Sequence, residues 1–164
     1  MSVSHRVCVS KEHLKFSAAH FIAYRGFREA LHGHNYQVSV RLEGRVGADG
    51  YVVDFGVIKR AVKRICESLD EKVLLPEASD CLAITREGGD VLVRYEDGAR
   101  FSFPESDVRL LPIVHSSAEE LAGYVLDRVA AELPDLADRG IGWVEVGVAE
   151  APGQVAYCRR DLAV

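Results

Sequence analysis

The sequence predicts an α+β domain in which an antiparallel sheet carries two helices on one face. Three observations support this expectation. The 164 residues suffice for one hydrophobic core, and 48% hydrophobic with 27% charged residues is ordinary globular composition. Four segments alternate apolar and polar residues as strands do, and two others repeat apolar residues at helical spacing. Their order is strand, strand, helix, helix, strand, strand, with a β segment inserted between the helices.

The first two strands each end their apolar face in histidine. From Val7 onward the chain is expected to be extended, with an inward face made of Leu14, Phe16, Ala18 and His20. A second strand is expected to begin near His32. Its inward face would consist of His32, His34, Tyr36, Val38, Val40 and Leu42.

A turn and a helix follow the second strand. Residues 48–50 supply turn residues, and residues 51–53 are expected to form a short return strand. Asp54 is a good N-cap for a helix. The buried stripe of that helix is expected to consist of Phe55, Ile58, Val62, Ile65 and Leu69.

Between the two helices, residues 81–103 are expected to form an inserted β-meander of three short strands. We expect this meander to decorate the outside of the fold without a chemical role, so that residues 1–164 form one domain. The second helix follows a capping box, either Ser116 with Glu119 or Ser117 with Glu120. Pro134 ends that helix.

The last two strands are expected over residues 142–150 and 155–160, joined by a turn. Alternation places Glu150 on the apolar face of the first of them. A carboxylate therefore ends this face, as histidines end the other two.

The composition of the sequence argues against two kinds of partner, nucleic acid and the membrane. The 20 Lys and Arg residues stand against 25 Asp and Glu, so nucleic acid is not an expected partner. No uncharged apolar run approaches the roughly 18 residues of a membrane span, and charges interrupt any signal-peptide core near the N-terminus. We therefore expect a cytoplasmic protein without a membrane segment.

Three histidines form a candidate zinc site. His32 and His34 stand at i and i+2 of one strand, so both imidazoles point to the same side, and His20 completes the set if its strand is adjacent. Three imidazoles leave a fourth coordination position open, which is the arrangement of a catalytic Zn²⁺ ion. The spacing alone equally fits ordinary polar residues at the mouth of a sheet.

Six segments, in order along the chain, resemble the 6-pyruvoyltetrahydropterin synthase family, including its 6-carboxytetrahydropterin synthase members. They are FSAAH (16–20), LHGHNY (31–36), VVDFGVIK (52–59), LDE (69–71), SSAEELA (116–122) and VGVAE (146–150). The resemblance implies a T-fold that assembles into a barrel, as a homohexamer of two stacked trimers. It also implies that His20, His32 and His34 bind zinc. By the same resemblance, Glu150 anchors a pterin, accepting from the amino and ring N–H groups of its 2-amino-4-oxopyrimidine edge.

The chain departs from the standard family pattern at two positions. Arg28 stands where the family has its catalytic cysteine, and Glu71 follows Asp70 where the family has a histidine. Glu29 gives the pattern Glu-Ala-Leu-His-Gly-His, which resembles the malaria-parasite class of the family. That class is associated with cleavage of 7,8-dihydroneopterin triphosphate to 6-hydroxymethyl-7,8-dihydropterin. The resemblance therefore implies a zinc-dependent lyase with Glu29 as its general base.

Other residues are candidates by the same resemblance. Asp70, Glu71 and His115 are candidate catalytic groups. The residues that either contact the pterin or cap the second helix are Ser116, Ser117 and Glu119. The alternative for the whole protein is a pterin-binding homologue without synthase activity, or one that acts on an unidentified pterin-like substrate.

Overall fold

The computed structural model describes residues 3–162 and is built around a six-stranded sheet, in the order β11–β10–β4–β1–β5–β9. Four of these strands are antiparallel neighbours, which confirms the sequence prediction. They are β1 (His5–His20), β4 (His32–Gly44), β10 (Ile141–Ala151) and β11 (Gln154–Asp161). Core side chains such as Phe16, Val40 and Val146 line the inward face and are almost fully buried.

Two short strands extend the sheet beyond the predicted four. β5 (Lys72–Pro76) runs parallel to β1, and β9 (Val108–Leu111) runs parallel to β5. The sheet is therefore mixed. Each added strand is a brief apolar run, and such a run does not reveal its partner or its direction.

A bulge in β1 sets which side chains of that strand face the core. Ser10 pairs with Ser39 of β4, and Lys15 pairs with Gln37. The chain therefore advances five residues along β1 while it advances two along β4. Because the excess of three is odd, the buried side chains change from odd numbers, such as Val9, to even numbers, such as Leu14. His20 faces inward as a result.

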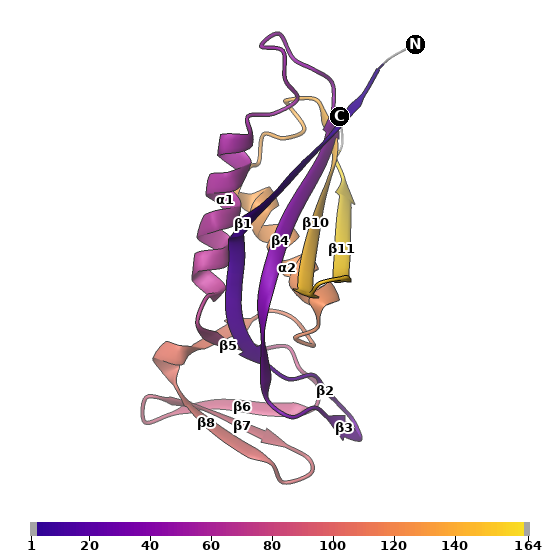
Figure 1. Cartoon of the computed structure of the whole chain (residues 1–164). Helices are drawn as coiled ribbons and strands as arrows, with labels where there is room; N and C mark the ends of the chain where they lie inside the picture. The colour runs from indigo at the N-terminus through magenta and orange to yellow at the C-terminus, as the bar shows by residue number, and fades with distance from the viewer. Residues whose placement is uncertain (1–2, 163–164) are drawn as a thin grey trace.

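Both helices pack on one face of the sheet (Figure 1), as predicted. α1 (Phe55–Leu69) begins after Asp54, whose carboxylate accepts from the Gly56 amide at 2.7 Å. α2 (Ala118–Glu132) begins after Ser117, whose hydroxyl accepts from the Glu120 amide. Among the described residues, no helix is long and apolar enough to cross a membrane.

Two expectations about the start of α1 are wrong. Residues 51–53 form bends rather than a return strand. Phe55 is exposed, so the buried stripe of α1 begins at Ile58. Val52 and Val53 bury their side chains in the connection ahead of the helix, which the helical periodicity does not anticipate.

The predicted meander is present as a separate three-stranded sheet. Its strands are β6 (Leu82–Glu87), β7 (Asp90–Tyr95) and β8 (Arg100–Pro104). A short 3-10 turn (Glu105–Asp107) leads from it to β9. The meander lies across one end of the long strands, and we call it the inserted sheet (Figure 1).

A two-stranded hairpin of β2 (Ala23–Tyr24) and β3 (Phe27–Arg28) lies at the same end of the molecule (Figure 1). It belongs to the connection between the histidine ends of β1 and β4. A second cluster of buried apolar side chains joins this connection to the inserted sheet; it includes Phe21, Ala23, Leu75, Val91, Val93 and Tyr95.

Candidate active site and metal centre

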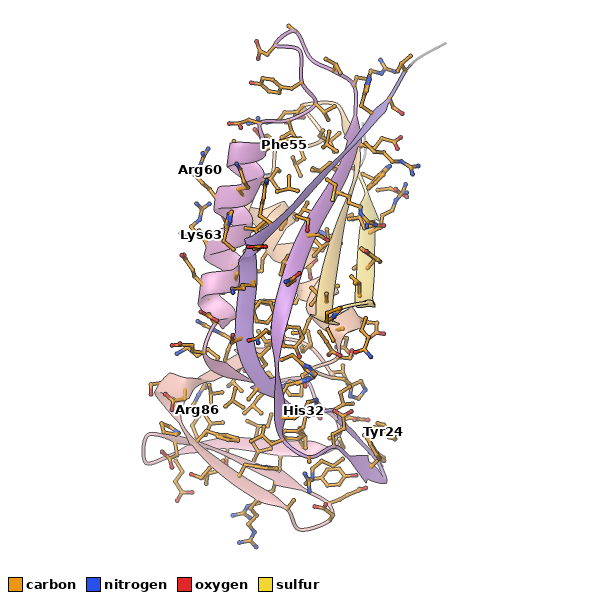
Figure 2. All side chains as sticks on the ribbon, viewed as in Figure 1. Tyr24, His32, Phe55, Arg60, Lys63 and Arg86 are labelled. Carbon is orange, nitrogen blue, oxygen red and sulfur yellow. The ribbon has the colours of Figure 1, made fainter. Side chains whose placement is uncertain are left out.

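Three histidines meet where β1 and β4 end. His20 is directly opposite His32 in the antiparallel register, and His34 follows two residues later on the same side of β4. One ring nitrogen from each of the three lies within 4.8 Å of the others. Figure 2 shows His32 at the end of β4 that faces the inserted sheet. The structure therefore brings together the three residues that the sequence singles out.

The hydrogen bonds of these histidines leave ring nitrogens directed at a common point. His20 Nδ1 donates to the Ser116 carbonyl oxygen at 2.7 Å, and His32 Nδ1 lies 2.8 Å from the Ala30 carbonyl oxygen. His20 Nε2 is buried and has no hydrogen-bond partner among residues 3–162. Burial also lowers the pKa of His20, which favours the neutral imidazole that binds a metal. This donor set fits Zn²⁺.

Glu150 and Tyr36 border the histidine cluster. The Glu150 Oε1 atom lies 4.0 Å from His20 Nε2. The Tyr36 ring stacks on Phe16 with centroids 4.7 Å apart, and its hydroxyl is buried without a hydrogen-bond partner among the described residues. Burial, reinforced by the Glu150 and Glu29 carboxylates, raises the pKa of Tyr36, so this phenol stays protonated.

The sequence predicts that the Tyr36 side chain lies in the core, but we did not predict that its hydroxyl borders the candidate site. The signal that identifies it is its position two residues after His34, on the face that carries the histidines. A tyrosine at such a place offers a donor to the site in addition to its packing.

Glu29 follows the hairpin and is half-buried. Its Oε2 accepts from the Ile22 amide at 2.9 Å, and its own amide donates to the Ile22 carbonyl oxygen at 3.0 Å. The residue is therefore fixed through both backbone and side chain to the segment that leaves His20. This arrangement argues against a freely solvated loop glutamate.

The segment ahead of α2 supports the site from the other side. Ser116 is fully buried, and its hydroxyl donates to the Phe21 carbonyl oxygen at 2.9 Å. His115 Nδ1 lies 3.1 Å from the Ala23 carbonyl oxygen. Of the two predicted capping pairs, the structure has Ser117 with Glu120: the Ser117 hydroxyl accepts from the Glu120 amide, and the Glu120 carboxylate accepts from the Val114 and His115 amides. Glu119 is exposed.

Cavities of a size suited to a small ligand adjoin these residues. One of about 530 Å³ is lined by residues that include His34, Glu150 and Pro152. A neighbouring one of about 490 Å³ is lined by residues that include Glu150, Ser117 and Glu119. The predicted pterin-contacting residues other than the buried Ser116 therefore share one region of the surface.

Asp70 and Glu71 lie apart from that region, at the end of α1. Asp70 Oδ1 accepts from the Ser17 amide at 2.7 Å, and the Glu71 amide donates to the Ser17 carbonyl oxygen at 2.7 Å. Glu71 lines a third cavity with Ala19 and His34. In this structure the pair ties α1 to β1, and its catalytic role stays a prediction.

Nearly the whole of the described chain matches one family model. That model, 6-pyruvoyl tetrahydropterin synthase, covers residues 8–161. The chain belongs to this family.

Relatives of the 6-pyruvoyl tetrahydropterin synthase family agree over nearly the full length. A Methanocaldococcus jannaschii protein that bears the name 6-carboxy-5,6,7,8-tetrahydropterin synthase is 38% identical over 92% of this chain and 93% of its own. A 6-pyruvoyl tetrahydropterin synthase of Plasmodium falciparum is 42% identical, with a TM-score of 0.96, over 98% of this chain and 100% of its own. The Plasmodium vivax protein is 41% identical, with a TM-score of 0.95 and the same coverage.

Two further comparisons concern the reactions that relatives catalyse. Structures of the Plasmodium vivax protein exist in which a glutamate, described as a catalytic residue, is replaced by alanine or cysteine. A Pyrococcus furiosus protein named dihydroneopterin monophosphate aldolase is 37% identical over 59 residues, which are 36% of this chain and 50% of that protein.

Proposed function

We propose that this protein is a zinc-dependent lyase that cleaves 7,8-dihydroneopterin triphosphate to 6-hydroxymethyl-7,8-dihydropterin. The observation that carries the proposal is a Glu29 carboxylate fixed to the segment that leaves His20, together with a cluster of three histidines, in a chain that has Arg28 where the family has its cysteine. A relative with a catalytic glutamate and a relative named as an aldolase support the same chemistry.

Glu150 would bind the pterin. Its carboxylate borders two cavities, one of which is also lined by His34, and is partly buried. An ionised carboxylate accepts two parallel hydrogen bonds from the amino and ring N–H groups of a 2-amino-4-oxopyrimidine. This contact would orient the substrate with its side chain toward Glu29 and the histidines.

Glu29 would act as the general base. It removes the proton of the C2′ hydroxyl, that oxygen becomes an aldehyde, and the C1′–C2′ bond breaks. The electron pair of this bond passes into the dihydropterin ring through C6 and N5. C1′ then takes a proton, which protonated Glu29 can return, and the triphosphate leaves on the aldehyde fragment.

His20, His32 and His34 would hold the metal. Bound there, Zn²⁺ would supply a Lewis acid that polarises a substrate oxygen. The hydrogen bonds from His20 to Ser116 and from His32 to Ala30 keep the rings oriented for that ion.

The test is incubation with 7,8-dihydroneopterin triphosphate and Zn²⁺, followed by separation of the pterin products. We expect 6-hydroxymethyl-7,8-dihydropterin from the unmodified protein, and turnover lower by about a hundredfold in Glu29→Gln, because a positioned base contributes roughly that much. Glu12→Gln is the matched control, since Glu12 is an exposed carboxylate in the β1 bulge.

Each other outcome has a defined meaning. Product at the same rate from Glu29→Gln would refute Glu29 as the base. Pterin that binds but is not converted would favour the second candidate, a pterin-binding homologue, which the loss of the cysteine at Arg28 and of the histidine at Glu71 makes reasonable.

A further inference from the structure

The hairpin that leads to Glu29 has too few contacts of its own to be rigid. β2 and β3 contain two residues each, and the tip at Gly26 adopts a φ of +85°. A lone hairpin of this size is not stable in water. Yet the hairpin must hold the backbone around Ile22 and Glu29 in one position for the Glu29 carboxylate to be aimed. The support comes from outside the hairpin.

Two consecutive residues of the inserted sheet bond to the backbone of the hairpin. Glu96 Oε1 accepts from the Gly26 amide at 2.6 Å, and the Tyr95 hydroxyl donates to the Tyr24 carbonyl oxygen at 2.8 Å. The Tyr95 hydroxyl also lies 3.0 Å from Glu96 Oε1. The two bonds to the hairpin join residues that are 70 and 71 positions apart in sequence.

Arg28 links the inserted sheet to Glu29 itself. Its Nη1 donates to the Glu29 carbonyl oxygen at 2.8 Å, while its Nη2 lies 3.4 Å from Asp97 Oδ2. The guanidinium also lies 5.5 Å from the centre of the Phe101 ring. The residue that replaces the family cysteine is thus a bridge between the glutamate and the inserted strands.

Apolar packing secures the other side of the same segment. Phe21 stacks on Phe101 with ring centroids 5.0 Å apart, and Phe21 and Ala23 belong to the buried cluster of the inserted sheet. The Phe21 and Ala23 carbonyl oxygens meanwhile contact Ser116 and His115.

We propose that the inserted sheet is a clamp that positions Glu29, with Glu96 as a positioning residue that acts through the Gly26 amide. The inference rests on the proposed function and deepens it. It differs from the expectation that residues 81–103 decorate the outside of the fold, because Tyr95 and Glu96 bond to the hairpin. Glu96 bonds to the Gly26 amide and to the Tyr95 hydroxyl, and no part of the reaction is assigned to it.

The experiment measures kcat and KM with 7,8-dihydroneopterin triphosphate in three variants. Glu96→Ala removes the acceptor of the Gly26 amide, and we expect kcat to fall about tenfold with KM within about twofold, because a shift of the base disturbs the reaction more than binding. Glu96→Gln keeps an oxygen that accepts from Gly26 and should retain kcat. Ser102→Ala is the control, since its hydroxyl bonds Asp90 within the inserted sheet.

Hydrogen exchange of residues 21–29 is measured alongside. We expect faster exchange in Glu96→Ala than in Glu96→Gln or Ser102→Ala. Unchanged exchange in Glu96→Ala would overturn the clamp even if turnover were absent in every variant. An unchanged kcat in Glu96→Ala, with turnover lost in Glu29→Gln, would overturn the positioning role and leave the proposed function standing. Unchanged turnover in Glu29→Gln would instead refute the proposed function.

Discussion

At the scale of single residues, Tyr36 has a buried hydroxyl without a hydrogen-bond partner within residues 3–162. A buried donor without a partner costs free energy that an apolar side chain of the same shape would not. We expect Tyr36→Phe to leave the free energy of unfolding unchanged or to raise it by about 1 kcal/mol. The same change should weaken pterin binding about tenfold, because a bound ligand would lose this donor.

Urea unfolding and titration with a dihydropterin measure the two effects. Phe16→Leu serves as the comparison, since it disturbs the ring on which Tyr36 stacks without removing the hydroxyl. Tyr36→Phe that unfolds more readily and binds pterin normally would mean that the hydroxyl has a structural partner.

The histidine cluster makes a second prediction at this scale. We expect protein purified without chelator to contain Zn²⁺, and His32→Ala to lose most of it, because two imidazoles hold the ion much less tightly than three. His13→Ala is the control, since His13 is exposed in the β1 bulge. Elemental analysis gives the result, and equal zinc in wild type and His32→Ala would remove His32 from the ligand set.

Alternation along the strands predicts that His20, His32 and Glu150 end apolar faces, but not which strands are neighbours. The observed register brings His20 and His32 together, and His34 lies two residues further along β4. The sequence did not predict the Tyr36 hydroxyl or the bridging role of Arg28. Both depend on contacts across segments, and residue spacing within one strand does not report such contacts.

At the scale of elements, Asp70 fastens the end of α1 to β1. Its carboxylate accepts from the Ser17 amide at 2.7 Å. We expect Asp70→Ala to lower the free energy of unfolding by about 1 kcal/mol through loss of this hydrogen bond, whereas Asp70→Asn retains an acceptor and stays close to wild type. Urea denaturation measures both. An equal loss in the two variants would show that the charge, not the acceptor, matters.

The long elements follow directly from the sequence, and the short ones do not. Helical spacing and caps predicted α1 and α2, and alternation predicted β1, β4, β10 and β11. The brief strands β5 and β9 were not predicted. β5 pairs in parallel with β1, and β9 with β5, and this pairing depends on the place at which α1 brings the chain back to the sheet. The strand expected over residues 51–53 is wrong because Val52 and Val53 both bury their side chains in a bend, whereas Tyr51 is exposed.

At the scale of the whole molecule, the sheet has two open edges, β11 and β9. Open edges present unpaired backbone groups and favour pairing with another chain. β11 also exposes Val155 and Tyr157, at 39% and 48%. The family resemblance implies a homohexamer of two trimers, so we expect sedimentation to give six times the 18.0 kDa of one chain. A monomer at micromolar concentration would contradict the hexamer.

A matched variant tests where the chains meet. Tyr157→Lys adds a charge to the β11 edge and should reduce the assembly, whereas Tyr51→Lys, on the exposed connection before α1, should not. Dissociation by both changes would point to a general loss of stability rather than to an interface at β11.

The bulge in β1 separates the length of a surface segment from the orientation of the site. Three extra residues stand between Ser10 and Lys15 relative to β4. Because directly opposed residues of an antiparallel pair point to the same side, His20 faces inward for as long as it stays opposite His32, whatever number of residues the bulge contains. Only a one-residue slip of the register after the bulge would turn Ala19 inward and His20 outward. Natural length changes of this family should therefore be tolerated between Ser10 and Lys15 and be absent between Lys15 and His20.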